Sequence, residues 1–179
     1  MNPVVFAVDD LREQYTQEMA LVRQTAERTG DGTAAIRRRS AVVDRILVEM
    51  WRRAFAGMPQ QNAALLAMGG YGRKDLFPYS DIDLLFLFAD ERTEARAHEA
   101  VRAVIQGIWD AGLRASPTSR TLKEAGRFDP DNIEFTLAAL DHRFLAGQFP
   151  LYQQLHQTVR PGLVLSEWNA ISQKLGEIA

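Results

Sequence analysis

The sequence contains no cysteine, which excludes disulfides, thiolate metal sites and cysteine catalysis. It also lacks a charge excess: Lys and Arg total 21, Asp and Glu total 23, and a net charge of −2 gives no general attraction to nucleic acid or anionic membranes. No apolar run reaches the length of a membrane span. The N-terminus has no basic segment, and Asp9 and Asp10 come too early for a signal peptide. These absences predict a cytoplasmic protein without membrane or nucleic-acid partners.

What is present is typical of one globular domain of 179 residues, 46% hydrophobic and 25% charged. We predict a single domain over residues 1–179, with helices in 1–60, a catalytic sheet core in 61–125 and helices again in 126–179. Such a domain could stand alone or be a fragment of a longer chain.

The apolar patterns predict an α/β (α+β) domain with a small mixed sheet flanked by helices. A buried strand is expected at 63–68, and a central one at 81–88, because that segment is apolar on both faces after Asp83. Residues 113–122 form a third strand or one broken by Pro117. Helices are expected at 9–28, from Ile36 onward, and at 91–112, 131–147, 149–159 and 165–179.

Three glycines follow the first predicted strand, in the run MGGYGRKDLFPYSDIDLL that begins at Met68. Gly69, Gly70 and Gly72 let the backbone turn sharply and present N–H groups to an anion. Arg73 and Lys74 place fixed positive charge beside the turn. The spacing matches neither a Walker A loop nor a dinucleotide-binding fingerprint. The run therefore predicts a cradle for the phosphates of a nucleotide.

Two aspartates open the second predicted strand. Asp81 and Asp83 are two residues apart and so project to the same face. Two adjacent carboxylates repel each other unless a cation lies between them, and carboxylate plus phosphate oxygens suit Mg²⁺. The alternative is an ordinary strand-entry turn capped by Ser80. The combination of phosphate cradle and carboxylate pair in one strand–turn–strand unit favours function.

This unit resembles the nucleotidyltransferase superfamily typified by DNA polymerase β. It is most similar to the N-terminal catalytic domain of bacterial PII-protein uridylyltransferases, which carry GGYGR, a leucine, a proline and SDIDLL. Those elements correspond here to Gly69–Arg73, Leu76, Pro78 and Ser80–Leu85. Flanking segments also resemble the family, notably 131–147, through Asp131, Thr136, Arg143 and Gly147.

The resemblance implies a polymerase β-like core with extra helices at both ends, and transfer of a nucleoside monophosphate from an NTP, UTP favoured, to a PII-type protein hydroxyl. Asp81 and Asp83 would be the catalytic and metal-binding residues, for Mg²⁺ or Mn²⁺. Gly69, Gly70, Gly72, Arg73 and Ser80 would bind the nucleotide.

The sequence also departs from the family. The run GHSVRT reads SPTSRT at 116–121, and no carboxylate lies between Leu113 and Thr121, where many superfamily members have a third one. This departure favours a rival interpretation, a non-catalytic nucleotide-sensing or protein-interaction module on the same fold. Nucleic-acid tailing is disfavoured by the charge balance.

Overall fold

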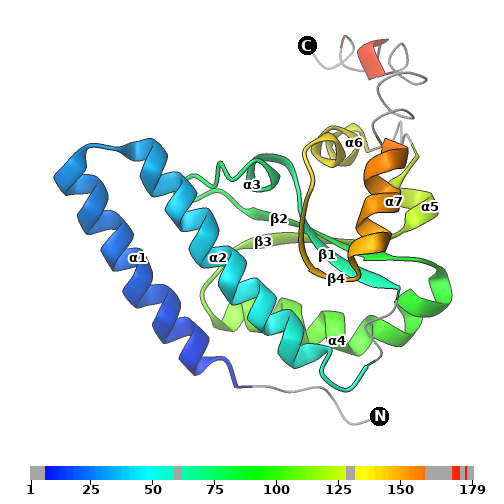
Figure 1. The fold of residues 1–179 in the computed structure, drawn as a ribbon, viewed down its shortest axis with the longest axis horizontal. Helices are drawn as coiled ribbons and strands as arrows, with labels where there is room; N and C mark the ends of the chain where they lie inside the picture. The colour runs from blue at the N-terminus through cyan, green and yellow to red at the C-terminus, as the bar shows by residue number, and fades with distance from the viewer. Residues whose placement is uncertain (1–6, 59–61, 128–131, 160–170, 174–175, 177–179) are drawn as a thin grey trace.

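The computed structural model describes residues 7–58, 62–127, 132–159, 171–173 and 176, and shows helices around a central sheet (Figure 1). Two long helices come first, α1 (Asp9–Thr29) and α2 (Gly32–Ala54). The remaining elements, in chain order, are β1 (Ala63–Ala67), α3 (Gly69–Gly72), β2 (Ile82–Phe88), α4 (Glu91–Asp110), β3 (Ala115–Thr121), α5 (Leu122–Ala125), α6 (Ile133–Leu140), β4 (Arg143–Gly147) and α7 (Phe149–Val159).

The sheet has four strands in the order β3-β2-β1-β4. β1 pairs antiparallel with both β2 and β4, whereas β2 and β3 are parallel and joined through α4. All five residues of β1 are buried, as expected for a strand with neighbours on both sides and helices on both faces. The predicted fold class, a small mixed sheet flanked by helices, is confirmed.

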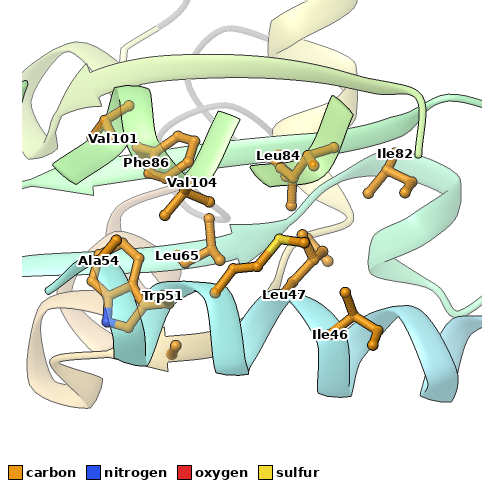
Figure 2. Packing of buried hydrophobic residues seen from close by; sticks show 14 of the residues in the cluster. Ile46, Leu47, Trp51, Ala54, Leu65, Ile82, Leu84, Phe86, Val101 and Val104 are labelled. Atoms are coloured by element: carbon orange, nitrogen blue, oxygen red, sulfur yellow. The ribbon is translucent and has the colours of Figure 1, made fainter. Parts of the chain in front are cut away.

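Helices cover both faces of the sheet and create two apolar clusters. On one face, α2 and α4 pack against alternate residues of β1 and β2, with Leu65, Leu84 and Phe86 between them (Figure 2). Trp51 of α2 stacks on Phe55 at a ring-centroid distance of 3.7 Å. On the other face, Leu66, Leu85 and Leu87 meet apolar side chains of α6 and α7. The two faces explain why β2 is apolar on both sides.

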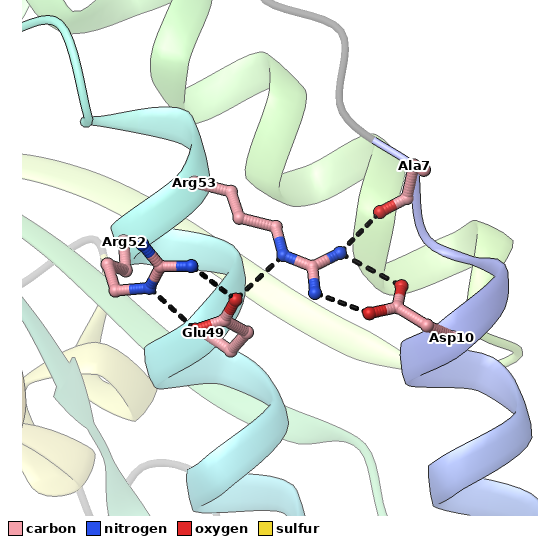
Figure 3. Close-up of polar contacts among 5 residues, drawn as sticks. All are labelled: Ala7, Asp10, Glu49, Arg52 and Arg53. Carbon is pink, nitrogen blue, oxygen red and sulfur yellow. Dashed lines mark hydrogen bonds and ion pairs between the residues drawn. The ribbon is translucent and has the colours of Figure 1, made fainter.

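Ion pairs and hydrogen bonds connect the start of α1 to the C-terminal part of α2 (Figure 3). Arg53 of α2 donates to the Asp10 carboxylate, to the Ala7 carbonyl oxygen at 2.6 Å and to Glu49 at 2.8 Å. The hydrogen bond and charge of Arg53 lower the pKa of Asp10 to about 2. The pKa of Glu49 is also lowered to about 2, by Arg52 first and then by Arg53.

Three local expectations need correction or comment. The helix predicted over 131–147 is wrong in its last part: α6 ends at Leu140, and Arg143–Gly147 form the edge strand β4. A five-residue segment with only three apolar side chains, Phe144–Ala146, fits either structure, and here it supplies hydrogen bonds to β1. The expected glycine loop is instead one helical turn, α3. β3 runs unbroken through Pro117, because that strand is at the sheet edge.

Asp131 and most of the predicted 165–179 helix lie outside the described residues. Within the described part of the chain, none of the helices is both long and apolar enough to cross a membrane.

Candidate active site

The segments of the predicted site meet at one end of the sheet. Ala67, the last residue of β1, pairs with Leu84 near the start of β2 and with Arg143 at the start of β4. The glycine turn α3 leaves β1 at this end, and β3 begins here, with Ala115 beside Ile82. Sequence-distant residues of four strands are therefore brought together around Asp83.

Asp83 lies against the glycine turn. Its carbonyl oxygen accepts a hydrogen bond from the N–H of Met68 at 3.0 Å, which fixes β2 to the residue preceding the turn. A Cβ placed on Gly69 would lie 3.5 Å from Asp83 Oδ2. Asp83 is half-buried, and burial raises the pKa of its carboxyl, which the nearby Asp81 charge raises further. The two predicted carboxylates are therefore electrostatic neighbours.

Asp81 is the exposed member of the pair, and its Oδ1 is 3.2 Å from Nε of Arg114, the residue before β3. The Asp83 side chain, by contrast, forms no ion pair or hydrogen bond within the described residues. A partly desolvated carboxylate, with no cation of its own and a second carboxylate beside it, suits a hard divalent cation. The donor set therefore fits Mg²⁺ or Mn²⁺, which Asp81 and Asp83 would hold.

β3 carries hydroxyl side chains in the region where the family resemblance implies a third carboxylate. Ser116 pairs with Asp83 and Thr118 with Leu85, so both hydroxyl side chains are on the Asp83 face of the sheet. Ser116 is exposed. In the described part of the chain, no group of three His, Cys, Asp or Glu side chains is placed to hold a metal.

The three glycines of the predicted cradle have different surroundings. Gly69 has a φ of +54°, a left-handed conformation that favours glycine. Gly70 has room for a Cβ, because its nearest contact would be the Asp75 carbonyl oxygen at 3.5 Å. A Cβ on Gly72 would lie 2.0 Å from the carbonyl oxygen of Asp141. Gly72 is thus required for the close packing of α3 on the chain between α6 and β4, whereas a Cβ on Gly70 would make only ordinary van der Waals contacts.

Alanine substitutions at Gly70 and Gly72 separate these roles. Gly70→Ala is expected to leave the free energy of unfolding nearly unchanged and to weaken nucleotide binding, because the added methyl occupies space that the fold leaves open. Gly72→Ala is the matched comparison and is expected to lose about 1–3 kcal/mol of stability through overpacking. Urea unfolding and calorimetric titration with UTP measure the two effects. Wild-type UTP affinity in Gly70→Ala would remove Gly70 from the cradle.

A polar clamp, not predicted from the sequence, holds the glycine turn. The Tyr71 hydroxyl donates to Asp44 Oδ1 of α2 at 2.6 Å, and Arg143 of β4 donates two hydrogen bonds to the same carboxylate, at 2.8 and 3.0 Å. Arg143 also donates to the carbonyl oxygens of Gly72 and Tyr71. The Tyr71 side chain is buried, and burial raises the pKa of its hydroxyl, as does the Asp44 charge. One sequence signal was available: Asp44 interrupts the apolar face of α2.

The remaining predicted residues lie around the turn. Arg73 has an exposed guanidinium that bonds Asp141 at 2.5 Å and approaches Asp75 at 3.4 Å, so two carboxylates position it. Lys74 has a φ of +67°, and its carbonyl oxygen accepts from the buried Ser40 hydroxyl at 2.9 Å. Ser80 is exposed, and its N–H donates to the Phe77 carbonyl oxygen.

Comparison with known proteins agrees with this geometry. Residues 16–125 match the family described as "Putative nucleotidyltransferase DUF294". The chain belongs to this nucleotidyltransferase family. The matched residues include α2, β1, the glycine turn and β2. Asp81, Asp83 and the three glycines therefore fall within the nucleotidyltransferase domain.

Curated relatives carry the name "bifunctional uridylyltransferase/uridylyl-removing enzyme". This chain is 35% identical to the enzyme of that name from Pasteurella multocida over 125 residues, which is 70% of this chain. It is 32% identical to the one from Nitrosospira multiformis over 164 residues, 89% of this chain. The one from Chromobacterium violaceum is 39% identical over 125 residues. The chain spans only 14%, 18% and 14% of these relatives, respectively.

Proposed function

We propose that the protein is a Mg²⁺-dependent nucleotidyltransferase that moves UMP from UTP to a hydroxyl of a protein acceptor, of which a PII-type regulator is the leading candidate. One observation carries the proposal: a carboxylate with a raised pKa, Asp83, lies directly against the glycine turn. The preference for UTP rests on the names of the relatives, and the PII-type acceptor rests on the sequence resemblance.

In the proposed reaction, the chain orients the reactants and neutralises charge. Asp81 and Asp83 would hold the metal, which supplies electrostatic neutralisation of the triphosphate oxygens. The open side of the glycine turn, at Gly69 and Gly70, would receive the triphosphate, and Arg73 would add positive charge beside it. The acceptor hydroxyl oxygen bonds to the α-phosphorus and loses its proton to water, while the bond to the β-phosphate oxygen breaks and pyrophosphate leaves.

The test combines α-labelled UTP, ATP, CTP or GTP with Mg²⁺ or Mn²⁺ and a PII-type protein. We expect label on the acceptor together with release of an equal amount of pyrophosphate, fastest with UTP. A PII-type acceptor with its modified tyrosine replaced by phenylalanine is the control and should remain unlabelled.

A second candidate is nucleotide sensing without transfer, and the hydroxyl-lined β3 favours it. Its signature would be saturable, metal-dependent UTP binding by calorimetry with neither labelled acceptor nor pyrophosphate under the same conditions. That result would contradict the transferase proposal but would still support the proposed nucleotide-binding site.

A further inference from the structure

A large groove lies beside the candidate active site. It has a volume of about 1070 Å³ and runs between α1 and α2 to the segments that precede β2 and β3. Its walls are mainly apolar side chains of α1 and α2. Leu113, which lies shortly before β3, completes them. The apolar lining residues include Tyr15, Met19, Val22, Ile36 and Leu113. This groove is not part of the carboxylate–glycine site itself.

The charged side chains that line the groove are mostly basic. Arg23, Arg39 and Arg114 are accompanied by a single acidic residue, Glu27. Arg23 forms no ion pair among the described residues. The Nε of Arg39 is buried and has no hydrogen-bond partner in the described part of the chain. A buried guanidinium N–H without an acceptor is unfavourable in a free protein and becomes favourable when a ligand supplies a carboxylate.

The groove adjoins the carboxylate pair, although neither Asp81 nor Asp83 lines it. Ser80 lines it and directly precedes Asp81, and Arg114 both lines it and forms the ion pair with Asp81. Asp81 directly precedes β2, and Asp83 is its second residue. The glycine turn follows β1, the neighbour of β2 on one side, and Arg114 precedes β3, the neighbour of β2 on the other side. In phosphoryl transfer the attacking and leaving oxygens are roughly in line. With the triphosphate at the glycine turn, on the β1 side of the carboxylates, the acceptor is placed on the β3 side, where Arg114 and this end of the groove lie.

We propose that this groove docks an acidic segment of the protein acceptor, with apolar side chains on its walls and carboxylates at Arg23 and Arg39, so that the target hydroxyl arrives beside Asp81. This inference rests on the proposed transfer to a protein hydroxyl. Among the alternative occupants, a nucleic-acid strand is disfavoured by the mainly apolar lining and by Glu27.

The decisive variant is Arg39→Glu, because Arg39 forms no hydrogen bond or ion pair among the described residues that its loss would break. The KM for the PII-type acceptor is expected to rise about ten- to a hundred-fold, the worth of one charge-assisted hydrogen bond, with the KM for UTP unchanged. Arg37→Glu is the matched control: it carries the same charge change two residues away on α2 but does not line the groove. Its acceptor KM should equal that of the wild type. Arg39→Ala should show a smaller increase than Arg39→Glu.

A binding measurement without nucleotide or metal keeps the inference testable if no acceptor is labelled. Fluorescence anisotropy would compare a labelled peptide of alternating Glu and Tyr with one of alternating Lys and Tyr. Wild-type and Arg37→Glu protein should bind the Glu-Tyr peptide, and Arg39→Glu should not. Absence of transfer by wild-type protein would defeat the proposed function alone. Equal Glu-Tyr binding by wild type and Arg39→Glu, preference for the Lys-Tyr peptide or an RNA oligonucleotide, or a raised KM for UTP alone would overturn the docking inference.

Discussion

Replacement of Asp83 by asparagine is expected to reduce metal-dependent transfer by about 10²–10⁴-fold, since the charge stabilisation that a metal ion supplies is worth several kcal/mol. The effect should fall on kcat, because the amide leaves the side-chain size and the backbone bond to Met68 intact. Asp81→Asn should show a loss of the same order. Single-turnover kinetics with saturating UTP and Mg²⁺ measure both effects.

Asp110→Asn is a suitable control for this experiment. Asp110 is an exposed carboxylate at the end of α4 that accepts a hydrogen bond from Gln106, and it has no contact with the site. Its substitution should leave transfer unchanged. Wild-type rates in the Asp81→Asn/Asp83→Asn double variant would show that the metal is held elsewhere.

The stability of the same variants should move in the opposite direction. The folded-state pKa of Asp83 is raised above its ordinary value of 3.8, so the folded protein holds the proton more tightly than the unfolded chain. Stability is therefore lost as pH rises from the ordinary to the raised pKa. Asp83→Asn removes this loss, and its free energy of unfolding without metal should exceed that of the wild type at pH 7 but not below pH 3.8.

The second large effect is expected at the clamp. Arg143→Ala should lower the free energy of unfolding by about 2–4 kcal/mol, because it leaves the largely buried Asp44 carboxylate without its cation. It also removes the donors to the Gly72 and Tyr71 carbonyl oxygens, so the UTP affinity of the remaining folded protein should fall as well. Urea unfolding and calorimetry measure the two losses separately.

Arg102→Ala serves as the comparison, because Arg102 lies in an exposed pair with Glu99 at 3.6 Å and should change stability by about 0.5 kcal/mol or less. The Asp44→Ala/Arg143→Ala double variant should lose less than the sum of the two single variants, since both act on one network. Additive losses, or a loss in Arg143→Ala no larger than in Arg102→Ala, would contradict the clamp.

The sequence was informative wherever short-range patterns determine structure. The continuous apolar run after Asp83 correctly predicts a central strand, and the segment Ala63–Ala67 is confirmed as its neighbour. The β4 segment was missed because a five-residue segment directly after a helix is too short to carry a period that distinguishes strand from helix. Its identity depends on the open edge of β1, which exists only once the chain has folded.

The site shows the same limit. The grouping of glycines and aspartates in one strand–turn–strand unit predicts their proximity, and the structure places Gly69 against Asp83. Pattern analysis of neighbouring residues could not find the clamp, because Asp44 and Arg143 are 99 positions apart. It also could not show that Gly72 serves packing against Asp141, since that contact joins segments distant in sequence.

The position of all these groups at one end of the sheet divides the molecule in a way that engineering can use. The opposite end, where α2 gives way to the chain leading into β1, carries no proposed catalytic, metal-binding or docking residue. Gly57 lies there, and a side chain added to it would meet open space. A reporter domain inserted at that residue would be separated from the carboxylates by the length of β1, so the catalytic unit could be tagged or immobilised without obstructing its substrates.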